Sequence, residues 1–304
     1  MSNSNQPVQS SVRARDIRKQ VLGSETSDGA GVRLRRYIAS PELSMLDPFL
    51  LLDVFRSDDP DDYIAGFPPH PHRGFETVTY LLNGRMRHRD SAGHEGVIGA
   101  GGVQWMTAGS GIEHSEMPEQ EQGLLYGFQL WVNLPAAEKM TRPRYQEYEP
   151  ERIPLEQRED GVQVRVIAGT TSEGTRGAVR DIAADATYMD ISLPPNSRFT
   201  QTIESGHNAF IYVINGTVEI VGDERSARVP AESLAVLSDG DRLVLQADGD
   251  SRVLLVAGRP FHEPVARYGP FVMNTQDEIQ QAFSDYRSGQ FGEISATVVG
   301  HDVA

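Results

Sequence analysis

The chain has 304 residues, with 28 Lys or Arg against 43 Asp or Glu, so its formal net charge at neutral pH is −15. This length predicts two domains, and the acidic charge argues against direct binding to nucleic acid or to an anionic membrane. Because the chain contains no cysteine, thiolate metal sites and cysteine nucleophiles are excluded, and any metal must be held by histidine and carboxylate.

The start and the middle of the chain differ in composition from the rest. Residues 1–15 are rich in Ser, Asn and Gln, and we expect a flexible N-terminal tail. The N-terminal region lacks the apolar segment of a signal peptide and no run of 18 apolar residues occurs, so we expect a cytoplasmic protein without a membrane span. Residues 141–160 combine prolines with many charges, which is typical of a linker.

Strand-like runs fill the two segments on either side of this linker. In residues 16–140 the runs FETVTYLLNG, VQWMTAGSG and LLYGFQLWVNLP are short, rich in β-branched and aromatic residues, and bounded by Gly, Pro and Asp. Similar runs, among them AFIYVING and SRVLLVAG, recur in residues 161–304. We therefore predict an all-β fold with a barrel or sandwich in each half.

The two halves resemble each other in sequence. The strand and Asn-Gly turn of Tyr80–Gly84 recur at Tyr212–Gly216, 132 residues later, and VQWMTAGSG has an echo in SLAVLSDG. Two matches in the same order indicate an internal duplication, although a strand followed by Asn-Gly also recurs by chance in β proteins.

One helix is predicted near the C-terminus, at about residues 275–288. Thr275 and Glu278 form a capping box, and Ile279, Phe283 and Tyr286 follow at the spacing of one helix face. We expect this helix to cover a barrel or the seam between domains.

Two pairs of side chains have the spacing of metal ligands on strands. His70 and His72, like His114 and Glu116, are two residues apart, so each pair projects from one face of an extended strand. Facing each other, the pairs would supply four nitrogen and oxygen ligands to a divalent first-row metal and leave one or two positions open. The alternative is that a His-x-His on a strand is exposed or simply hydrogen-bonded.

Three motifs give the chain a family resemblance: HPHRGFETVTYLLNG, QWMTAGSGIEHSEMP and EPVARYGPFVMNT. Together they resemble the pirin family of the cupin superfamily, over residues from about 15 to 292. The resemblance implies two cupin barrels, of which the N-terminal one, residues 16–140, binds one iron through His70, His72, His114 and Glu116. It also implies that the C-terminal barrel, residues 161–304, is free of metal.

The residues around the motifs allow further expectations. Glu76 stands at the general cupin ligand spacing, but the pirin-like motif favours Glu116, which leaves Glu76 as a carboxylate beside the metal or as a buried acid paired with Arg73 or Arg85. His88 and His94 are expected at the surface or in a turn. The positions that correspond to the four ligands in the second half are Thr202, Glu204, Leu243 and Leu245, and the two leucines cannot bind a metal. Aromatic and large residues near the motifs are expected in the core, or alternatively along a slot for a planar substrate: Phe67, Phe75, Trp105, Met106, Phe128 and Trp131.

The function implied by the resemblance is dioxygenation of a flavonol such as quercetin, with a small planar aromatic substrate, dioxygen and one divalent metal. Fe(II) is the expected metal, and Ni, Cu, Mn, Co and Zn are compatible with the same ligands. Glu116 or Glu76 would accept the substrate's hydroxyl proton. The alternatives are an iron-binding regulatory protein that acts through protein contacts, and an isomerase or hydrolase that uses the metal as a Lewis acid.

Overall fold

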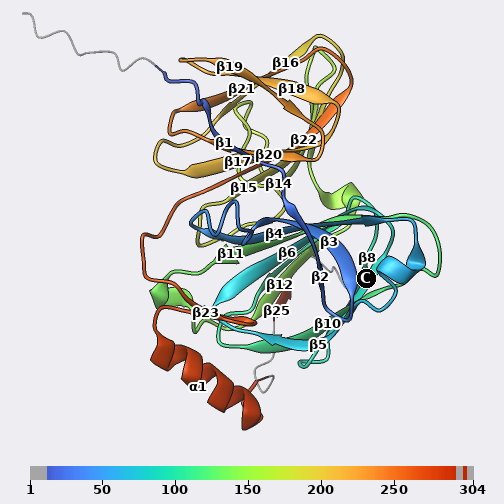
Figure 1. Ribbon diagram of the computed structural model, residues 1–304, viewed down its shortest axis with the longest axis vertical. Coiled ribbons are helices and arrows are strands. Elements are labelled where there is room, and N and C mark those ends of the chain that lie inside the picture. The colour runs from blue at the N-terminus through green and yellow to red at the C-terminus, as the bar shows by residue number, and fades with distance from the viewer. Residues whose placement is uncertain (1–11, 292–296, 300–304) are drawn as a thin grey trace, which may run out of the picture.

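The short apolar runs form β-strands, which the computed structural model arranges as two stacked barrels with one α-helix (Figure 1). The structure describes residues 12–291 and 297–299. The predicted all-β class with two barrels and a C-terminal helix is confirmed. No helix among the described residues is long and apolar enough to cross a membrane.

The N-terminal barrel consists of a large and a small sheet. The large sheet has the order β2 (Ser24–Asp28), β3 (Val32–Ile38), β4 (Phe49–Ser57), β11 (Leu125–Asn133), β6 (Phe75–Asn83), β9 (Val103–Thr107), β12 (Arg144–Tyr148) and β25 (Thr297–Val299). The small sheet has the order β5 (Phe67–His72), β10 (Ile112–Pro118), β7 (Met86–Asp90) and β8 (Glu95–Ile98). Short 3₁₀ turns lie at η1 (Pro60–Asp62), η2 (Ala136–Glu138) and η3 (Pro150–Arg152).

The C-terminal barrel repeats this plan. Its large sheet has the order β1 (Ile17–Val21), β20 (Ser233–Leu237), β17 (Asn208–Asn215), β22 (Ser251–Gly258), β15 (Thr187–Leu193), β14 (Gln163–Ala168) and β13 (Leu155–Gln157). Its small sheet has the order β16 (Ser197–Thr202), β21 (Arg242–Ala247), β18 (Thr217–Val221) and β19 (Ser226–Pro230). Strands β4 to β11 and β15 to β22 correspond one to one in chain order and in sheet order, which supports the internal duplication.

The two large sheets pack against each other and form the core between the barrels. Phe128 of β11 meets Tyr212 of β17 with ring centres 5.4 Å apart, and both belong to one buried apolar cluster that includes side chains from both barrels. On this face of the N-terminal barrel, the alternation of β6 directs Val78 and Tyr80 into the cluster. The opposite face of the same strands is left to line the barrel interior.

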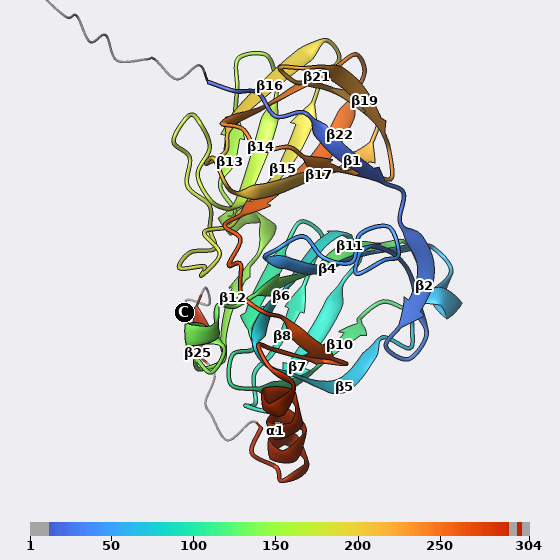
Figure 2. The same ribbon diagram turned by 60° about the vertical axis from the view of Figure 1, so that its left-hand side comes forward.

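The N-terminal segment belongs to the C-terminal barrel. Strand β1 pairs with β20 and lies with the strands of the C-terminal barrel (Figure 2). Arg15 is buried, and its guanidinium donates to the carbonyl oxygens of Glu204, His207 and Ser238. Of the expected tail at residues 1–15, residues 1–11 lie outside the described residues, while residues 13–15 differ from the expectation because they are hydrogen-bonded to this barrel.

The segment 141–160 contains two strands rather than a plain linker. Strand β12 pairs with β9 of the N-terminal barrel, and β13 pairs with β14 of the C-terminal one. Some of its polar residues are buried with partners: the Gln146 amide donates to the carbonyl oxygen of Arg180 at 2.7 Å, and Glu147 accepts from Gln104 at 3.0 Å. Part of the polarity that makes this segment resemble a linker therefore lies in a hydrogen-bonded interior.

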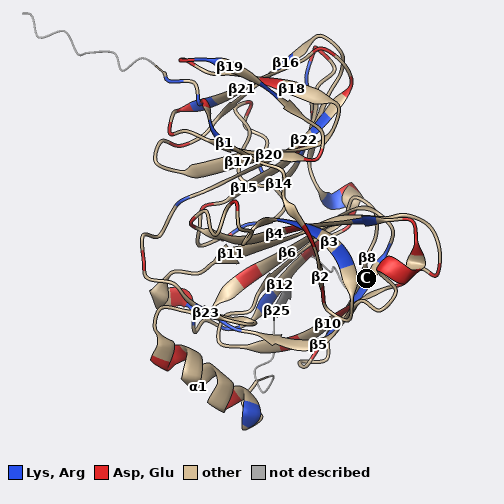
Figure 3. Cartoon of the chain, viewed as in Figure 1, with Lys and Arg blue, Asp and Glu red and all other residues tan. Residues whose placement is uncertain are grey.

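The chain returns to the N-terminal barrel after β22. Residues 259–287, here called the C-terminal strap, contain the hairpin of β23 (Ala266–Tyr268) and β24 (Phe271–Met273) and the helix α1 (Gln276–Arg287). Figure 2 shows β23 and α1 lying against the lower barrel, where Arg73 forms an ion pair with Asp285 at 2.7 Å. The capping box of α1 is present, and the helix has acidic residues in its first turn and Arg287 in its last, which favours its dipole (Figure 3).

Candidate metal centre

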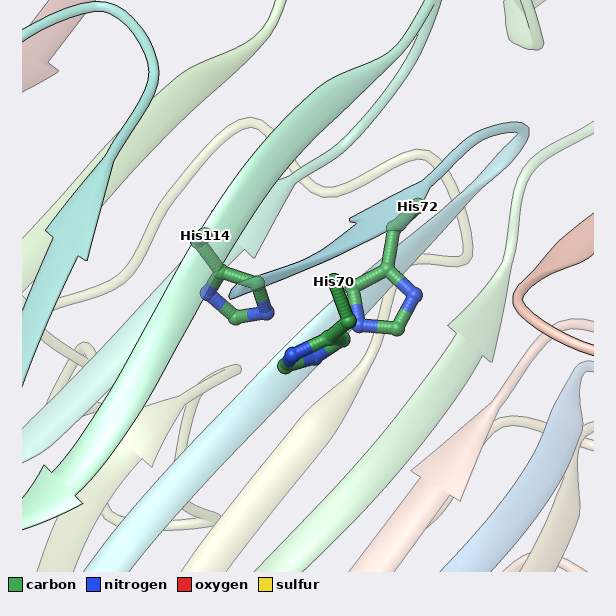
Figure 4. A group of neighbouring side chains, drawn as sticks. All are labelled: His70, His72 and His114. Atoms are coloured by element: carbon green, nitrogen blue, oxygen red, sulfur yellow. The ribbon is translucent and has the colours of Figure 1, made fainter. Parts of the chain in front are cut away.

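Strands β5 and β10 bring three histidines together inside the N-terminal barrel. In the antiparallel register His114 lies directly opposite His70, and alternation along β5 places His72 on the same face as His70. The three ring centres are 4.5 to 5.1 Å apart, and one ring nitrogen from each lies within 4.8 Å of the others. Figure 4 shows the three imidazoles converging from the two strands.

The protonation of these rings suits metal binding. The Nδ1 atoms of His70 and His72 lie 2.8 and 3.4 Å from the carbonyl oxygens of Pro68 and Pro270. A carbonyl oxygen only accepts, so each Nδ1 carries the hydrogen and each Nε2 keeps a free lone pair. Burial lowers the pKa of His72, and the neighbouring His70 adds to this effect, which keeps the ring neutral at neutral pH.

His114 provides the strongest sign that a group is to be bound here. Both of its ring nitrogens are buried and have no hydrogen-bond partner among the described residues. Burial and the two neighbouring histidines lower its pKa, so the ring is neutral and offers a lone pair. Leaving a buried imidazole unpaired is costly, and a divalent metal between the three rings would satisfy it. The donor set present therefore fits the metal that the motifs imply.

Glu116 lies on the wall of the same site, outside the compact group of three histidines. A bulge between His114 and Glu116 shifts the pairing of β10 with β5. The Glu116 carboxylate accepts from the hydroxyl of Thr79 at 2.7 Å and from the amide of Gln129 at 3.0 Å, and the residue is buried. These contacts fix the Glu116 side chain at the wall of the cavity that His70 and His72 also line.

Glu76 is placed elsewhere, which is at odds with its expected role as a carboxylate beside the metal. The chain turns at Arg73 and Gly74, so the parity of the histidines does not continue into β6. Thr79 faces the cavity, whereas Glu76 shares the opposite face with Val78. The hydroxyl of Thr107 donates to Glu76 at 2.7 Å, and burial raises the pKa of this carboxyl.

The arginines expected as partners of Glu76 are occupied by other acids. Arg73 pairs with Asp285 of the C-terminal strap, and Arg85 pairs with Glu119 at 3.0 Å. The second carboxyl oxygen of Glu76 has no hydrogen-bond partner among the described residues, in agreement with the raised pKa of this carboxyl.

His88 is buried in the barrel rather than at the surface. It lies opposite Glu116 in the register of β7 and β10, and its Nε2 is 3.1 Å from the carboxylate of Glu147. A signal for this was present in the sequence, because the charged Arg87 and Arg89 alternate with the other residues of the segment. In the structure the two arginines are exposed and the other residues of β7 are buried. His94 is partly exposed and contacts Asp90 at 3.1 Å, as a turn residue would.

A cavity of about 590 Å³ opens onto His70 and His72. Its walls come from the β2–β3 turn, from β4, β5, β10 and β11, and from the C-terminal strap. Phe67 and Trp131 of the expected aromatic residues line it, whereas Trp105 and Phe128 lie in the core between the barrels and Met106 in a smaller core. Phe75 packs on Trp131 with ring centres 4.3 Å apart.

The strap contributes cavity residues that no local sequence pattern reveals. Pro270 offers its carbonyl oxygen to His72, and the guanidinium of Arg267 lies over the ring of Trp131 at 4.6 Å. Both come from a segment almost two hundred residues away in the chain. Only the return of the chain to the first barrel places them here.

The interior of the C-terminal barrel has apolar residues where the N-terminal barrel has ligands. Leu243 and Leu245 of β21, the counterpart of β10, are fully buried in an apolar cluster. A separate group of Asp185, Glu204 and His207 lies on this barrel, where His207 Nε2 is 3.9 Å from each carboxylate. Both carboxylates are largely exposed, so this group differs in kind from the buried histidines.

Comparison with known proteins gives consistent matches along the chain. The family description "Pirin" matches residues 31–132, and "Pirin C-terminal cupin domain" matches residues 188–292. A pirin-like protein of Caulobacter vibrioides is 53% identical over 277 residues, which cover 91% of this chain and 99% of the relative. Human pirin is 45% identical over 282 residues, covering 92% and 94%.

Solved structures agree with the sequence matches. A crystal structure of quercetin 2,3-dioxygenase from Acinetobacter baumannii is 35% identical, with a TM-score of 0.82, and the match covers 92% of this chain and 99% of that one. The resemblance found in the three sequence motifs is confirmed, and the chain belongs to the pirin family, as a protein of two cupin barrels.

Proposed function

We propose that the chain is a metal-dependent dioxygenase that acts on a flavonol such as quercetin at the N-terminal barrel, with Fe(II) as its metal. The observation that carries the proposal is the buried, unpaired His114, which faces His70 and His72 at the end of a cavity with aromatic walls. The similarity to a solved quercetin 2,3-dioxygenase supports the substrate class.

Each residue has a distinct part in this proposal. His70, His72 and His114 would hold the metal through their free nitrogens, with Glu116 as the fourth ligand. A divalent metal so held supplies a Lewis acid that lowers the pKa of a bound hydroxyl group. Glu116 would accept the hydroxyl proton, since Thr79 and Gln129 fix its carboxylate in the cavity wall. Trp131 offers an aromatic surface beside the histidines, with its ring 5.2 Å from that of His72.

The proposal is tested by oxygen uptake. Protein loaded anaerobically with Fe(II) is mixed with quercetin and then exposed to air, while dissolved oxygen and quercetin absorbance are followed together. We expect both to fall in the wild type and to stay constant in His114→Ala treated in the same way. If the metal-loaded wild type consumes no oxygen and leaves quercetin unchanged, the dioxygenase proposal fails and the regulatory alternative is favoured.

A further inference from the structure

The cavity wall formed by the C-terminal strap carries a positive charge. Four charged side chains line the cavity, and of these Asp28, Asp53 and Glu116 are acidic while Arg267 is the cation. Arg267 is half-buried on β23, and its Nη1 donates to the carbonyl oxygen of Leu50 at 3.3 Å. The rest of its guanidinium is available to a bound molecule.

The acidic residues of the wall are occupied by other partners. Arg36 donates to both oxygens of Asp53 at 2.7 and 2.6 Å and to Asp28 at 2.8 Å. Glu116 is held by Thr79 and Gln129. Within the part of the chain that the structure describes, no carboxylate forms an ion pair with Arg267.

A partly buried cation that forms no direct ion pair with a described carboxylate is an unusual element of a cavity wall. Removing an arginine from water is costly unless an anion or a set of acceptors replaces the water. Here the replacement is a single carbonyl oxygen and the face of Trp131. Burial lowers the pKa of Arg267 and the charge of Arg36 adds to this effect, while the charges of Asp53 and Asp28 act in the opposite direction without a direct ion pair to Arg267.

The position of Arg267 relative to the histidines defines what it could recognise. Trp131 contacts both the guanidinium of Arg267 and the ring of His72. The cation and the histidine group therefore border the same part of the cavity. A flat molecule bound in this part would have its ring system near Trp131 and its negative group within reach of Arg267, as guanidinium binds planar anions well.

We propose that Arg267 is a specificity-determining residue, which makes the cavity selective for planar aromatic anions, phenolates or carboxylates, over neutral molecules of the same shape. The inference rests on the proposed function because it names the substrate class of the same cavity. For a flavonol, the group recognised would be an ionised ring hydroxyl.

The experiment measures binding rather than turnover. Isothermal titration calorimetry of the Fe(II)-loaded protein under anaerobic conditions compares 2-naphthoate with 2-naphthamide, which have the same shape but differ in charge. We expect the wild type to prefer the anion and Arg267→Gln to lose about 10- to 100-fold in affinity for it, the range of a charge-assisted hydrogen bond. Affinity for the amide should change by less than about threefold, and Arg267→Lys should recover part of the preference.

Controls separate this role from two others. Arg35→Gln removes a partly exposed arginine that pairs with Glu25 and does not line the cavity, and it should leave both affinities unchanged. Equal losses for anion and amide in Arg267→Gln would show that Arg267 only holds the strap in place. A preference that survives Arg267→Gln and disappears when a chelator removes the metal would show that the metal binds the carboxylate. Either result overturns the inference.

The outcome is independent of the dioxygenase test. A protein that binds 2-naphthoate through Arg267 and yet consumes no oxygen with quercetin keeps the anion preference and loses the proposed activity. A protein that consumes oxygen with quercetin, and whose Arg267→Gln variant keeps its preference for the anion, retains the activity and loses the role of Arg267.

Discussion

Two buried glutamates of the N-terminal barrel, Glu116 on β10 and Glu76 on β6, face different surroundings. Glu116 faces the cavity and is held by two hydrogen bonds, whereas Glu76 faces the core between the barrels with one oxygen unpaired. In sequence both have the spacing of a cupin ligand. The alternation of β6 after the turn at Gly74 decides which of them can meet a substrate.

Glu116→Gln should therefore lower the turnover of quercetin, whereas Glu76→Gln should not. We expect Glu116→Gln to lose most of the turnover of quercetin while keeping part of the metal, because an amide oxygen can coordinate but is a far poorer base. Glu76→Gln should keep both metal and turnover. Oxygen uptake and metal content of the two variants, measured side by side, check this, and an inactive Glu76→Gln with full metal would reverse the assignment.

The convergence of the three histidines predicts that the metal content of the protein depends on each of them. Changing His70 or His114 to Ala should reduce the one metal per chain to near zero, because each change removes one of the three imidazoles that converge in the cavity. His207→Ala should keep it, since His207 lies in the separate group of the C-terminal barrel, whose two carboxylates are exposed. Elemental analysis of dialysed protein is the measurement. Full metal content in both cavity variants would show that the metal is bound elsewhere.

At the scale of elements, the C-terminal strap is fastened to the turn that follows His72. Lys139 is buried and its ammonium group donates to the carbonyl oxygens of Gly74 and Val272 and to Asn133, at 2.8 to 3.0 Å. Gly74 has a φ of +87°, and a Cβ there would lie 2.0 Å from the Val272 oxygen. The strap thus lies so close to this turn that residue 74 has no room for a side chain.

Gly74→Ala should separate the strap from the barrel. The control is Gly93→Ala, because Gly93 has a similar φ of +91° with open space around it. We expect Gly93→Ala to cost about 1 kcal/mol, the backbone strain alone. Gly74→Ala should cost several kcal/mol and weaken metal binding as well, since His72 and Pro270 would move. Thermal unfolding of both variants measures the difference, and equal losses would contradict a close contact with Val272.

Lys139 should make the attachment of the strap depend on pH. Burial lowers the pKa of Lys139 from 10.5 to about 8, so the unfolded chain holds this proton more tightly than the folded one. The cost of burying the charge is present in full below pH 8 and is relieved as the pH rises from about 8 to 10.5. Relative to Lys139→Met, the wild type should gain up to about 3 kcal/mol over this range. Denaturant unfolding at several pH values checks the trend, with exposed Lys19→Met as the control that should show none.

At the scale of the whole molecule, each end of the described chain serves the barrel made mainly by the other half. Strand β1 completes the large sheet of the C-terminal barrel, and the C-terminal strap closes the cavity of the N-terminal one. Together with the apolar core between the two large sheets, this exchange makes separate folding of either half unfavourable. We expect the C-terminal barrel, which has Leu243 and Leu245 on the strand that corresponds to β10, to act as a support for the site.

Substitution of Arg15 tests how much the N-terminal segment stabilises the C-terminal barrel. Arg15→Met should lower the free energy of unfolding by about 2 to 4 kcal/mol, because three buried carbonyl oxygens lose their donor. Arg13→Met should change it by less than about 1 kcal/mol, since Arg13 forms an exposed ion pair with Asp239. Urea unfolding of the two variants gives the comparison, and similar values for both would contradict a structural role for this segment.

The sequence by itself determined the features that depend on local spacing. Alternation over two residues identified His70 with His72 and His114 with Glu116, Asn-Gly turns indicated the duplicated barrels, and the capping box located helix α1. These patterns survive folding because strand and helix periodicity fixes which side chains share a face within an element.

Only the tertiary structure decided which faces meet. It placed Glu76 outside the cavity, buried His88 beside Glu147, and brought Arg267 to Trp131 from a distant segment. It also paired β12 with the first barrel and β1 with the second. Such pairings depend on how sheets twist and on where the chain crosses between barrels, and neither is written in the spacing of neighbouring residues.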